Sequence, residues 1–436
     1  MTPDTQLEFA TQVVQRLVDA GYEALWAGGC VRDLLLGRTP KDYDVATNAR
    51  PDQVRELFGR RRTLAVGESF GVIVVLGPKA AGQVEVATFR TDGDYLDGRR
   101  PDSVTFCTAM EDAKRRDFTI NGMFFDPLSE RVLDFVGGER DLAAGVIRAI
   151  GNPTARMQED KLRMLRAVRF AATFEFHLDE DTASAIRSMA TQIDVVSAER
   201  IAAELRKMLG HEHRDRALQL TADVDLLPEI LPELQAVAER PAEWSRLLQH
   251  LRLLADADFS VAFAAVFAAI ADARNLNADD AAAAIDAAGR RLRLSNREIA
   301  DANWLTTHRH ALRDAASLSL ARIKRTLAEP LAGDLLKFDR ADRLSRDEEP
   351  VDADFCAEFL AAHTADEINP PSYLTGRMLI ARGHVPGPEF KDILDAVREA
   401  QLNLQITTSD EAIALAEELM SDLTGGSADL TERSSE

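Results

Sequence analysis

Two short segments near the N-terminus stand out: Gly28-Gly29-Cys30-Val31-Arg32-Asp33 and, shortly after it, Lys41-Asp42-Tyr43-Asp44. The paired glycines let the backbone approach a ligand closely, and a helix that starts just after them offers free N–H groups to phosphates. Asp42 and Asp44 are two residues apart on an expected strand, so both carboxylates project from one face. Such a pair suits Mg²⁺, which binds through one or two carboxylates plus substrate phosphates. An isolated Asp-x-Asp pair is usually only solvated, but the preceding glycine turn favours a nucleotidyl-transfer site.

A third carboxylate is available on a neighbouring strand. Glu85 lies within Val84-Glu85-Val86-Ala87-Thr88-Phe89-Arg90, a run of apolar β-formers. A charged residue in such a strand faces either water or a site, and the sequence leaves both readings open. Placed beside Asp42 and Asp44, Glu85 would complete a two-metal centre that stabilises an attacking and a leaving oxygen.

Strand patterns are confined to the first 150 residues. The expected strands are 23–27, 42–46, 71–76, 83–89 and 132–136, with the third and fourth joined as a hairpin across a Gly-Pro turn. After about residue 154 helical spacing dominates: 157–174 reads as one helix, and the apolar run 261–270 as a buried helix. The acidic, proline-bearing stretch 346–372 reads as a linker. The chain is therefore expected to be α+β, with a small mixed-sheet head followed by helical pieces.

Taken together, the motifs resemble those of the class II tRNA nucleotidyltransferase and bacterial poly(A) polymerase family, within the polymerase-β-type nucleotidyltransferases. The similarity covers most of the first 230 residues and, more faintly, the tail. Besides the two opening segments and the Glu85 strand, its motifs are Lys114-Arg115-Arg116-Asp117-Phe118-Thr119-Ile120-Asn121, Glu159-Asp160-Lys161-Leu162-Arg163 and Ser197-Ala198-Glu199-Arg200-Ile201. Each motif alone is weak, but the set in this order is specific.

The resemblance implies a division of the chain and a set of site residues. The expected parts are a catalytic head (1–150), a neck with the base-selecting motif (151–232), a helical body (233–345), a helical RNA-binding tail (346–424) and a disordered C-terminus (425–436). The catalytic residues would be Asp42, Asp44 and Glu85, with Asp42 and Asp44 as Mg²⁺ ligands. The nucleotide-binding residues would be Gly28, Gly29, Arg32, Asp33, Lys41, Arg116, Asp117, Asn121, Asp160, Arg163, Arg166 and Arg169.

The chemistry of these side chains fits the implied roles. Arg115 and Arg116 can neutralise phosphate, and Asn121 can hydrogen-bond a ribose hydroxyl. Asp160 and Arg163 would share a helix face and offer acceptors and donors to the Watson–Crick edge of a base, or else form an ordinary salt bridge. Arg166 and Arg169 continue that face, either supporting the site or the RNA backbone, or as a solvated stripe.

The expected activity is addition of CCA to the tRNA 3′ end from CTP and ATP. A poly(A) polymerase, an A-adding tRNA nucleotidyltransferase and a non-catalytic RNA-binding relative remain alternatives. The polar stretch 91–103 matches the position of the family's flexible loop, which argues weakly against a CC-only enzyme. The basic segment 60–64 keeps the poly(A) reading open.

Composition limits the other possibilities. The 436 residues carry a net charge of −21, so binding to RNA requires a local basic strip, which we expect across the head and neck. Three dispersed cysteines and the absence of a signal peptide or a long apolar run indicate a cytoplasmic protein without a membrane partner. No P-loop motif occurs. The pairs His211/His213 and His308/His310 are expected to lie on helices with their rings apart, and the sequence indicates no particular oligomeric state.

Overall fold

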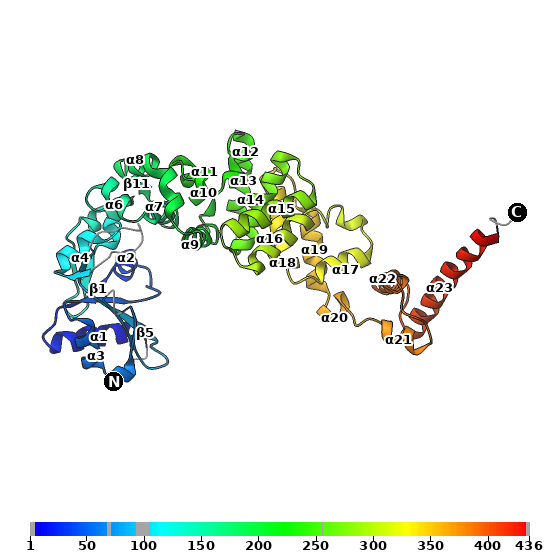
Figure 1. The fold of residues 1–436 in the computed structure, drawn as a ribbon, viewed down its shortest axis with the longest axis horizontal. Coiled ribbons are helices and arrows are strands. Elements are labelled where there is room, and N and C mark those ends of the chain that lie inside the picture. Colours follow the sequence, from blue (N-terminus) through cyan, green and yellow to red (C-terminus); the bar gives the residue numbers. More distant parts are fainter. Residues whose placement is uncertain (1–4, 68–70, 93–103, 255, 433–436) are drawn as a thin grey trace. The chain divides into compact units, whose positions relative to one another are not determined.

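The computed structural model describes residues 5–67, 71–92, 104–254 and 256–432. These residues divide into two compact units: Met1–Trp244 with Ala287–Ser295, and Ser245–Asp286 with Asn296–Glu436. As expected, strands are concentrated in the first part of the chain and the remainder is mostly helical (Figure 1). In the described part of the chain, no helix is both long and apolar enough to cross a membrane.

A mixed sheet forms the centre of the head. Among the described residues it has seven strands in the order β3-β4-β5-β2-β1-β8-β9, in which only the β2–β5 pair is parallel. The elements of the head are α1 (Gln6–Asp19), β1 (Ala24–Ala27), α2 (Gly29–Leu35), β2 (Asp44–Thr47), α3 (Pro51–Phe58), η1 (Arg60–Arg62), β3 (Thr63–Gly67), β4 (Val72–Leu76), β5 (Gln83–Thr88), β6 (Arg90–Asp92), β7 (Val104–Phe106), α4 (Ala109–Arg115), η3 (Thr119–Asn121), β8 (Phe124–Asp126), β9 (Arg131–Leu133), α5 (Gly138–Ala144) and β10 (Val146–Ile147).

The two faces of this sheet are covered by different helices. Alternation along β4 and β5 places Val75 and Val84 on one face, and Val74 and Glu85 on the other. Helices α1 and α3 contact the first face. Helix α4 covers part of the second, where its Ala109 and Ala113 pack with Leu25, Ala46 and Phe124 in a buried cluster. The second face therefore carries Glu85 and leaves room beside α4 for a site.

Helices build the rest of the chain. They are α6 (Pro153–Glu159), α7 (Leu162–Thr173), α8 (Glu180–Met189), η4 (Ala190–Val195), α9 (Ala198–Leu209), α10 (Arg214–Asp223), α11 (Leu227–Ile230), η5 (Pro232–Leu234), α12 (Gln235–Ala238), α13 (Pro241–Leu253), α14 (Phe259–Arg274), α15 (Ala278–Arg291), α16 (Asn296–His308), η6 (Ala315–Ser317), α17 (Leu320–Leu327), α18 (Ala332–Ser345), α19 (Val351–Ala362), α20 (Ala365–Ile368), α21 (Gly376–Ala381), α22 (Glu389–Leu402) and α23 (Ser409–Glu432), with the short strand β11 (His177–Leu178) beside β10.

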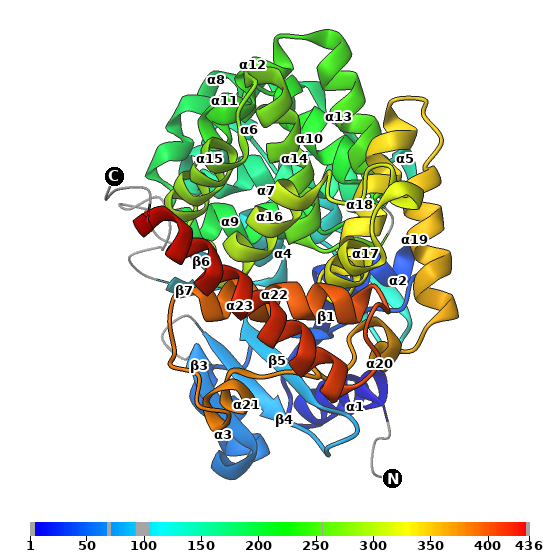
Figure 2. The ribbon, with the colours of Figure 1, turned by 90° about the vertical axis from the view of Figure 1, so that its right-hand side faces the viewer.

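Two helical cores within the second unit are clear. The expected helix at 261–270 is α14, which is buried along most of its length and packs against α16. In the tail, α21, α22 and α23 share a core of their own around Leu379, Val397 and Ala412. Figure 2 shows α22 and α23 packed together.

Several expected boundaries need correction. The linker predicted at 346–372 contains α19 and α20, because Cys356 and Ile368 are buried and anchor those helices. The predicted helix 157–174 breaks between α6 and α7, where Asp160 has extended backbone angles. The strand predicted at 132–136 is β9, which ends at Leu133. Residues 425–432, expected to be disordered, form the end of α23, which begins at Ser409.

A buried histidine in the second unit predicts a pH-dependent stability. His250 on α13 is 4% exposed, its ring lies edge-on to Phe338, and its Nε2 has no hydrogen-bond partner among the described residues. Burial lowers the pKa of His250 from 6.5 to about 4. Between these values the unfolded chain binds a proton that the folded chain does not, so His250 contributes stability above pH 6.5 that is lost as the pH falls toward 4.

We expect this contribution to fall by about 2 kcal/mol between pH 7 and pH 5. The measurement is urea unfolding of the protein and of His250→Phe at both pH values. The variant has no proton-binding group at this position but keeps an apolar ring. Between pH 7 and pH 5 its free energy of unfolding should therefore fall by about 2 kcal/mol less than that of the unmodified protein. An equal fall in both proteins would show that His250 titrates normally.

Candidate functional site

Carboxylates from adjacent strands come together on the open face of the sheet. Asp44 begins β2 and pairs in register with Glu85 on β5, while Asp42 precedes β2 by two residues. Asp44 is exposed to solvent, but protein atoms surround much of it. This burial is the largest cause that raises its pKa to about 6; repulsion from Glu85 and Asp42 also raises it, and attraction to Arg116 lowers it. The oxygens of the three carboxylates do not all lie within 4.8 Å of one another, but two neighbouring carboxylates can hold a divalent cation, which would relieve their repulsion.

The glycine turn brings the backbone up to an arginine. Gly28 precedes α2 with φ +72°, and a Cβ on it would lie 2.9 Å from Nη1 of Arg116. Arg116 donates to Asp112 Oδ2 from Nη2 at 3.0 Å and to the carbonyl oxygen of Asn121 at 3.2 Å. Arg115 donates to the other Asp112 oxygen at 2.8 Å. Asp112 is thus a buried anchor that fixes both guanidinium groups beside Asp44.

A second buried acid organises the residues after α4. Asp117 accepts from Asn121 Nδ2 at 3.0 Å and from Arg166 Nη2 at 2.6 Å. Although burial opposes ionisation, Arg166 and these hydrogen bonds hold the pKa of Asp117 at about 2. Arg32 donates to Asn121 Oδ1 at 2.8 Å and to Asp33 at 2.8 Å. Asn121 is therefore held between Asp117 and Arg32 with a fixed orientation.

The base-selecting residues lie at the junction of α6 and α7 rather than on one helix face. Asp160 follows α6, and Arg163 is in the first turn of α7. Both oxygens of Asp160 accept from Arg200, at 2.7 and 3.1 Å, instead of from Arg163. Arg163 pairs with Glu159 and donates to the carbonyl oxygen of Arg156 at 3.0 Å. Each residue has its own support, and neither forms the simple Asp160–Arg163 salt bridge that was the alternative reading.

One cavity of about 420 Å³ collects most of the expected residues. Its lining residues are Gly28, Gly29, Arg32, Asp44, Arg115, Arg116, Asp117, Asn121, Asp160, Arg163, Arg166 and Phe170. Five expected residues are not among them: Asp33 holds Arg32, Arg169 pairs with buried Glu204, and Lys41, Asp42 and Glu85 are exposed outside the cavity lining. Five arginines line this cavity, and each is ion-paired with an acidic residue, so the basic strip expected across the head and neck stays a prediction.

Sequence reasoning left three useful residues out of the site. Arg200 sits in the motif at 197–201 and orients Asp160. Asp112 could have been found from its spacing of three and four residues before Arg115 and Arg116 on α4. Phe170 lines the cavity and lies 5.2 Å from the Arg166 guanidinium carbon. Its pattern in the sequence was that of an ordinary core residue.

The histidine pair at 211 and 213 is placed differently from the prediction. These residues lie in the turn between α9 and α10, not on a helix, and their ring centroids are 5.3 Å apart. With Glu212 they form the one cluster of potential metal ligands found among the described residues. His213 lies 3.6 Å from Glu175, and the Nδ1 of His211 already accepts the His213 backbone N–H at 3.2 Å.

Comparison with known proteins agrees with this geometry. Residues 24–148 match the poly A polymerase head domain, and residues 175–238 match the probable RNA and SrmB-binding site of polymerase A. The CCA-adding enzyme of Lactobacillus helveticus is 42% identical over 229 residues. Poly(A) polymerase I of Salmonella typhimurium is 42% identical over 240 residues. This part of the chain is thus similar both to CCA-adding enzymes and to a bacterial poly(A) polymerase.

Similarity to these proteins is uneven along the chain. The matched stretch covers 52% of the chain and 56% of the Lactobacillus enzyme, and 52% of the chain and 50% of the Salmonella enzyme. The chain thus spans about half the length of these relatives. In three dimensions the likeness is longer: the Bacillus stearothermophilus CCA-adding enzyme, solved in complex with CTP, matches with a TM-score of 0.77 and 28% identity, over 98% of this chain and all of that one.

Proposed function

We propose that this protein adds CMP, CMP and AMP to the 3′ end of tRNA without a nucleic-acid template, using CTP and ATP and releasing pyrophosphate. The observation that carries the proposal is the arginine-lined cavity between the Asp44 carboxylate and the Asp160–Arg163 pair. A nucleoside triphosphate bound there would have acids at its reacting phosphate and a donor–acceptor pair at its base. The family relatives named CCA-adding enzymes support the same reading.

The proposal includes Mg²⁺ held by Asp42 and Asp44, with Glu85 beside them. When bound, the cation would supply charge stabilisation for the reacting oxygens and lower the pKa of the attacking hydroxyl. The chain's own residues do the positioning. Arg115 and Arg116, anchored on Asp112, would neutralise the triphosphate, and the oriented Asn121 would hydrogen-bond the ribose.

The base is read by hydrogen bonding alone. Cytosine and adenine both present an exocyclic amine beside an unprotonated ring nitrogen, whereas uracil and guanine present a carbonyl beside a ring N–H. The Asp160 carboxylate can accept from the amine, and Arg163 can donate to the ring nitrogen. This pattern admits CTP and ATP and leaves buried polar groups unpaired when UTP or GTP enters.

Poly(A) polymerase activity is the second candidate, favoured by the Salmonella relative at the same identity as the Lactobacillus enzyme. The loop predicted to separate A-adding from CC-adding members lies, from residue 93 onward, outside the described residues. A cytoplasmic location belongs to the proposal as well. It is supported by Cys30, Cys107 and Cys356, which are free thiols in the structure.

The deciding experiment offers the purified protein, with Mg²⁺, tRNAs that end before CCA, after C and after CC, each with CTP, ATP or both. Growth of the shortest tRNA by CCA followed by arrest supports the proposal. One A added only to the CC-ended tRNA identifies an A-adding enzyme, and long A tracts identify a poly(A) polymerase. No incorporation, also with Mn²⁺, leaves the non-catalytic RNA-binding relative.

The glycine turn gives a sharper prediction for the same assay. Gly28→Ala places a methyl group against Arg116 and should displace its guanidinium from Asp44, so we expect incorporation to fall by about tenfold or more, as for loss of one oriented charge-assisted hydrogen bond. Gly37→Ala is the matched control. Gly37 has a φ of +70° but nothing within 4 Å of its Cβ position, so it shares the backbone strain without the displacement. Equal losses in the two variants would mean that strain alone is responsible.

A further inference from the structure

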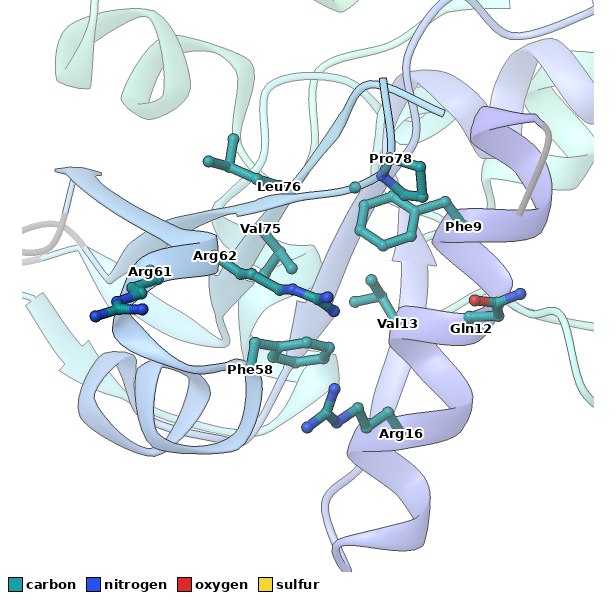
Figure 3. Close-up of a pocket in the computed structure, with 11 residues that line it drawn as sticks. Phe9, Gln12, Val13, Arg16, Phe58, Arg61, Arg62, Val75, Leu76 and Pro78 are labelled. Carbon is teal, nitrogen blue, oxygen red and sulfur yellow. The ribbon is translucent and has the colours of Figure 1, made fainter. Parts of the chain in front are cut away.

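A second cavity, of about 690 Å³, lies in the head on the side of the sheet away from the carboxylates. It is lined by α1, by the end of α3 with η1, and by β4 and the turn after it (Figure 3). Val75 of β4 lines it, and the strand alternation puts Val75 on the opposite face from Val74 and Glu85. The two cavities therefore do not share an opening on one face of the sheet.

This cavity is basic without a compensating acid. Three arginines line it, Arg16, Arg61 and Arg62, and none of its lining residues is acidic. The guanidinium groups of Arg61 and Arg62 form no hydrogen bond or ion pair with any residue that the structure describes. In Figure 3 the Arg62 side chain points from η1 toward Val13 on α1. The side chains of Arg61 and Arg62 are both exposed, so this wall of the cavity presents uncompensated positive charge in a chain whose net charge is −21.

The rest of the wall is suited to a planar apolar group. Phe9 and Phe58 line the cavity from α1 and α3, and Pro78 closes one end. Arg16 is held in place, because it donates to the Leu57 carbonyl oxygen at 2.6 Å and lies 5.1 Å from the centre of the Phe58 ring. Gln12 also lines the cavity. The volume falls within the range of small-ligand sites, roughly 300–1,000 Å³.

We propose that this cavity is a second nucleotide site, which binds the phosphate of a nucleoside phosphate through Arg62, with Arg61 at its outer edge, and its base against Phe9 and Phe58. Arginine pairs with phosphate in a bidentate manner, and bases stack on aromatic rings and guanidinium planes. The ligand is either a free nucleotide or one nucleotide of an RNA strand. The inference stands apart from the proposed activity, since none of its residues belongs to the carboxylate site.

The test localises binding as well as measuring it. The full-length protein is titrated calorimetrically with AMP, adenosine and inorganic phosphate, and by fluorescence anisotropy with labelled pentaadenylate. Photo-crosslinking with 8-azido-AMP, followed by peptide mapping, separates this cavity (peptides around 9–16, 58–62 and 75–78) from the catalytic one (115–121 and 160–170). The variants are Arg62→Gln and, as a matched control from the same basic triplet, Arg60→Gln, because Arg60 is exposed but does not line the cavity.

We expect crosslinks in the first set of peptides, and a loss of about tenfold in affinity for that site in Arg62→Gln, the usual effect of removing one charge-assisted contact. Arg60→Gln should change it less than about twofold, as for a screened surface charge. If Arg62→Gln weakens the binding of AMP, the ligand of this cavity is a free nucleotide. If it weakens the binding of pentaadenylate alone, the ligand is RNA. Crosslinks only in the catalytic peptides, or phosphate binding as tight as AMP, would overturn the proposal. Unchanged thermal unfolding of Arg62→Gln checks that the variant is folded.

Discussion

Asp44→Asn should lower the rate of nucleotide incorporation by about a thousandfold while leaving the protein at least as stable as before. Asp44 pairs in register with Glu85, and burial, followed by repulsion from Glu85 and Asp42, raises its pKa to about 6. An amide is a poorer ligand for a cation than a carboxylate is. It also has no negative charge to balance a cation bound at the reacting phosphate. Loss of several kcal/mol of transition-state stabilisation corresponds to roughly a thousandfold lower rate.

The stability half of this prediction separates it from simple unfolding. Burial is the largest cause of the raised Asp44 pKa, and repulsion from Glu85 and Asp42 adds to it, so removing this charge should leave the thermal midpoint the same or higher. Single-turnover extension of a tRNA lacking CCA measures the rate, and thermal unfolding without added metal measures the stability. Asp52→Asn on α3 is the control: it removes one exposed carboxylate from the other side of the head, and it should incorporate normally. A lower midpoint for Asp44→Asn together with weak but measurable incorporation would instead assign Asp44 a structural role.

How far the sequence predicts this molecule depends on the range of the interactions involved. Local patterns predict β1, the β4–β5 hairpin and α14, because alternation, turn residues and apolar runs act within a few positions. They fail at 346–372, where acidic residues and prolines suggest a linker but buried Cys356 anchors a helix. That burial depends on residues distant in sequence and leaves no local pattern.

The candidate site shows the same division. Two clear strand patterns in the sequence predict that Asp44 and Glu85 lie on neighbouring strands. They do not predict that these strands run parallel with the two residues in register. The partner of Asp160 does not follow at all. Spacing suggested Arg163, three residues away, whereas the structure supplies Arg200 from α9, forty residues away. An extended backbone at Asp160 turns its side chain out of the helical series, and no pattern of helical spacing anticipates that.

This arrangement leads to the second large effect, a change in base preference. Arg200 now donates to each Asp160 oxygen, at 2.7 and 3.1 Å, and in Asp160→Asn only one of these contacts can remain, because an amide nitrogen cannot accept from a guanidinium. We expect the amide oxygen to stay on Arg200 and the amide nitrogen to turn toward the cavity. The group that meets the base then becomes a donor, which matches the carbonyl of uracil or guanine and opposes the amine of cytosine or adenine. We expect kcat/KM for CTP relative to UTP to fall by about a hundredfold, the size of penalty that unpaired buried polar groups impose.

The measurement is single-nucleotide incorporation with each of the four triphosphates in turn. Arg200→Gln is the informative partner variant, because it loosens Asp160 without changing its acceptor chemistry. It should slow all four nucleotides in similar proportion, whereas Asp160→Asn should slow CTP and ATP and speed UTP and GTP relative to the unmodified protein. If both variants show the same proportional slowing, Asp160 supports the α6–α7 junction and does not read the base. In that case selection must come from other residues around the cavity, of which Arg163 is the first to replace.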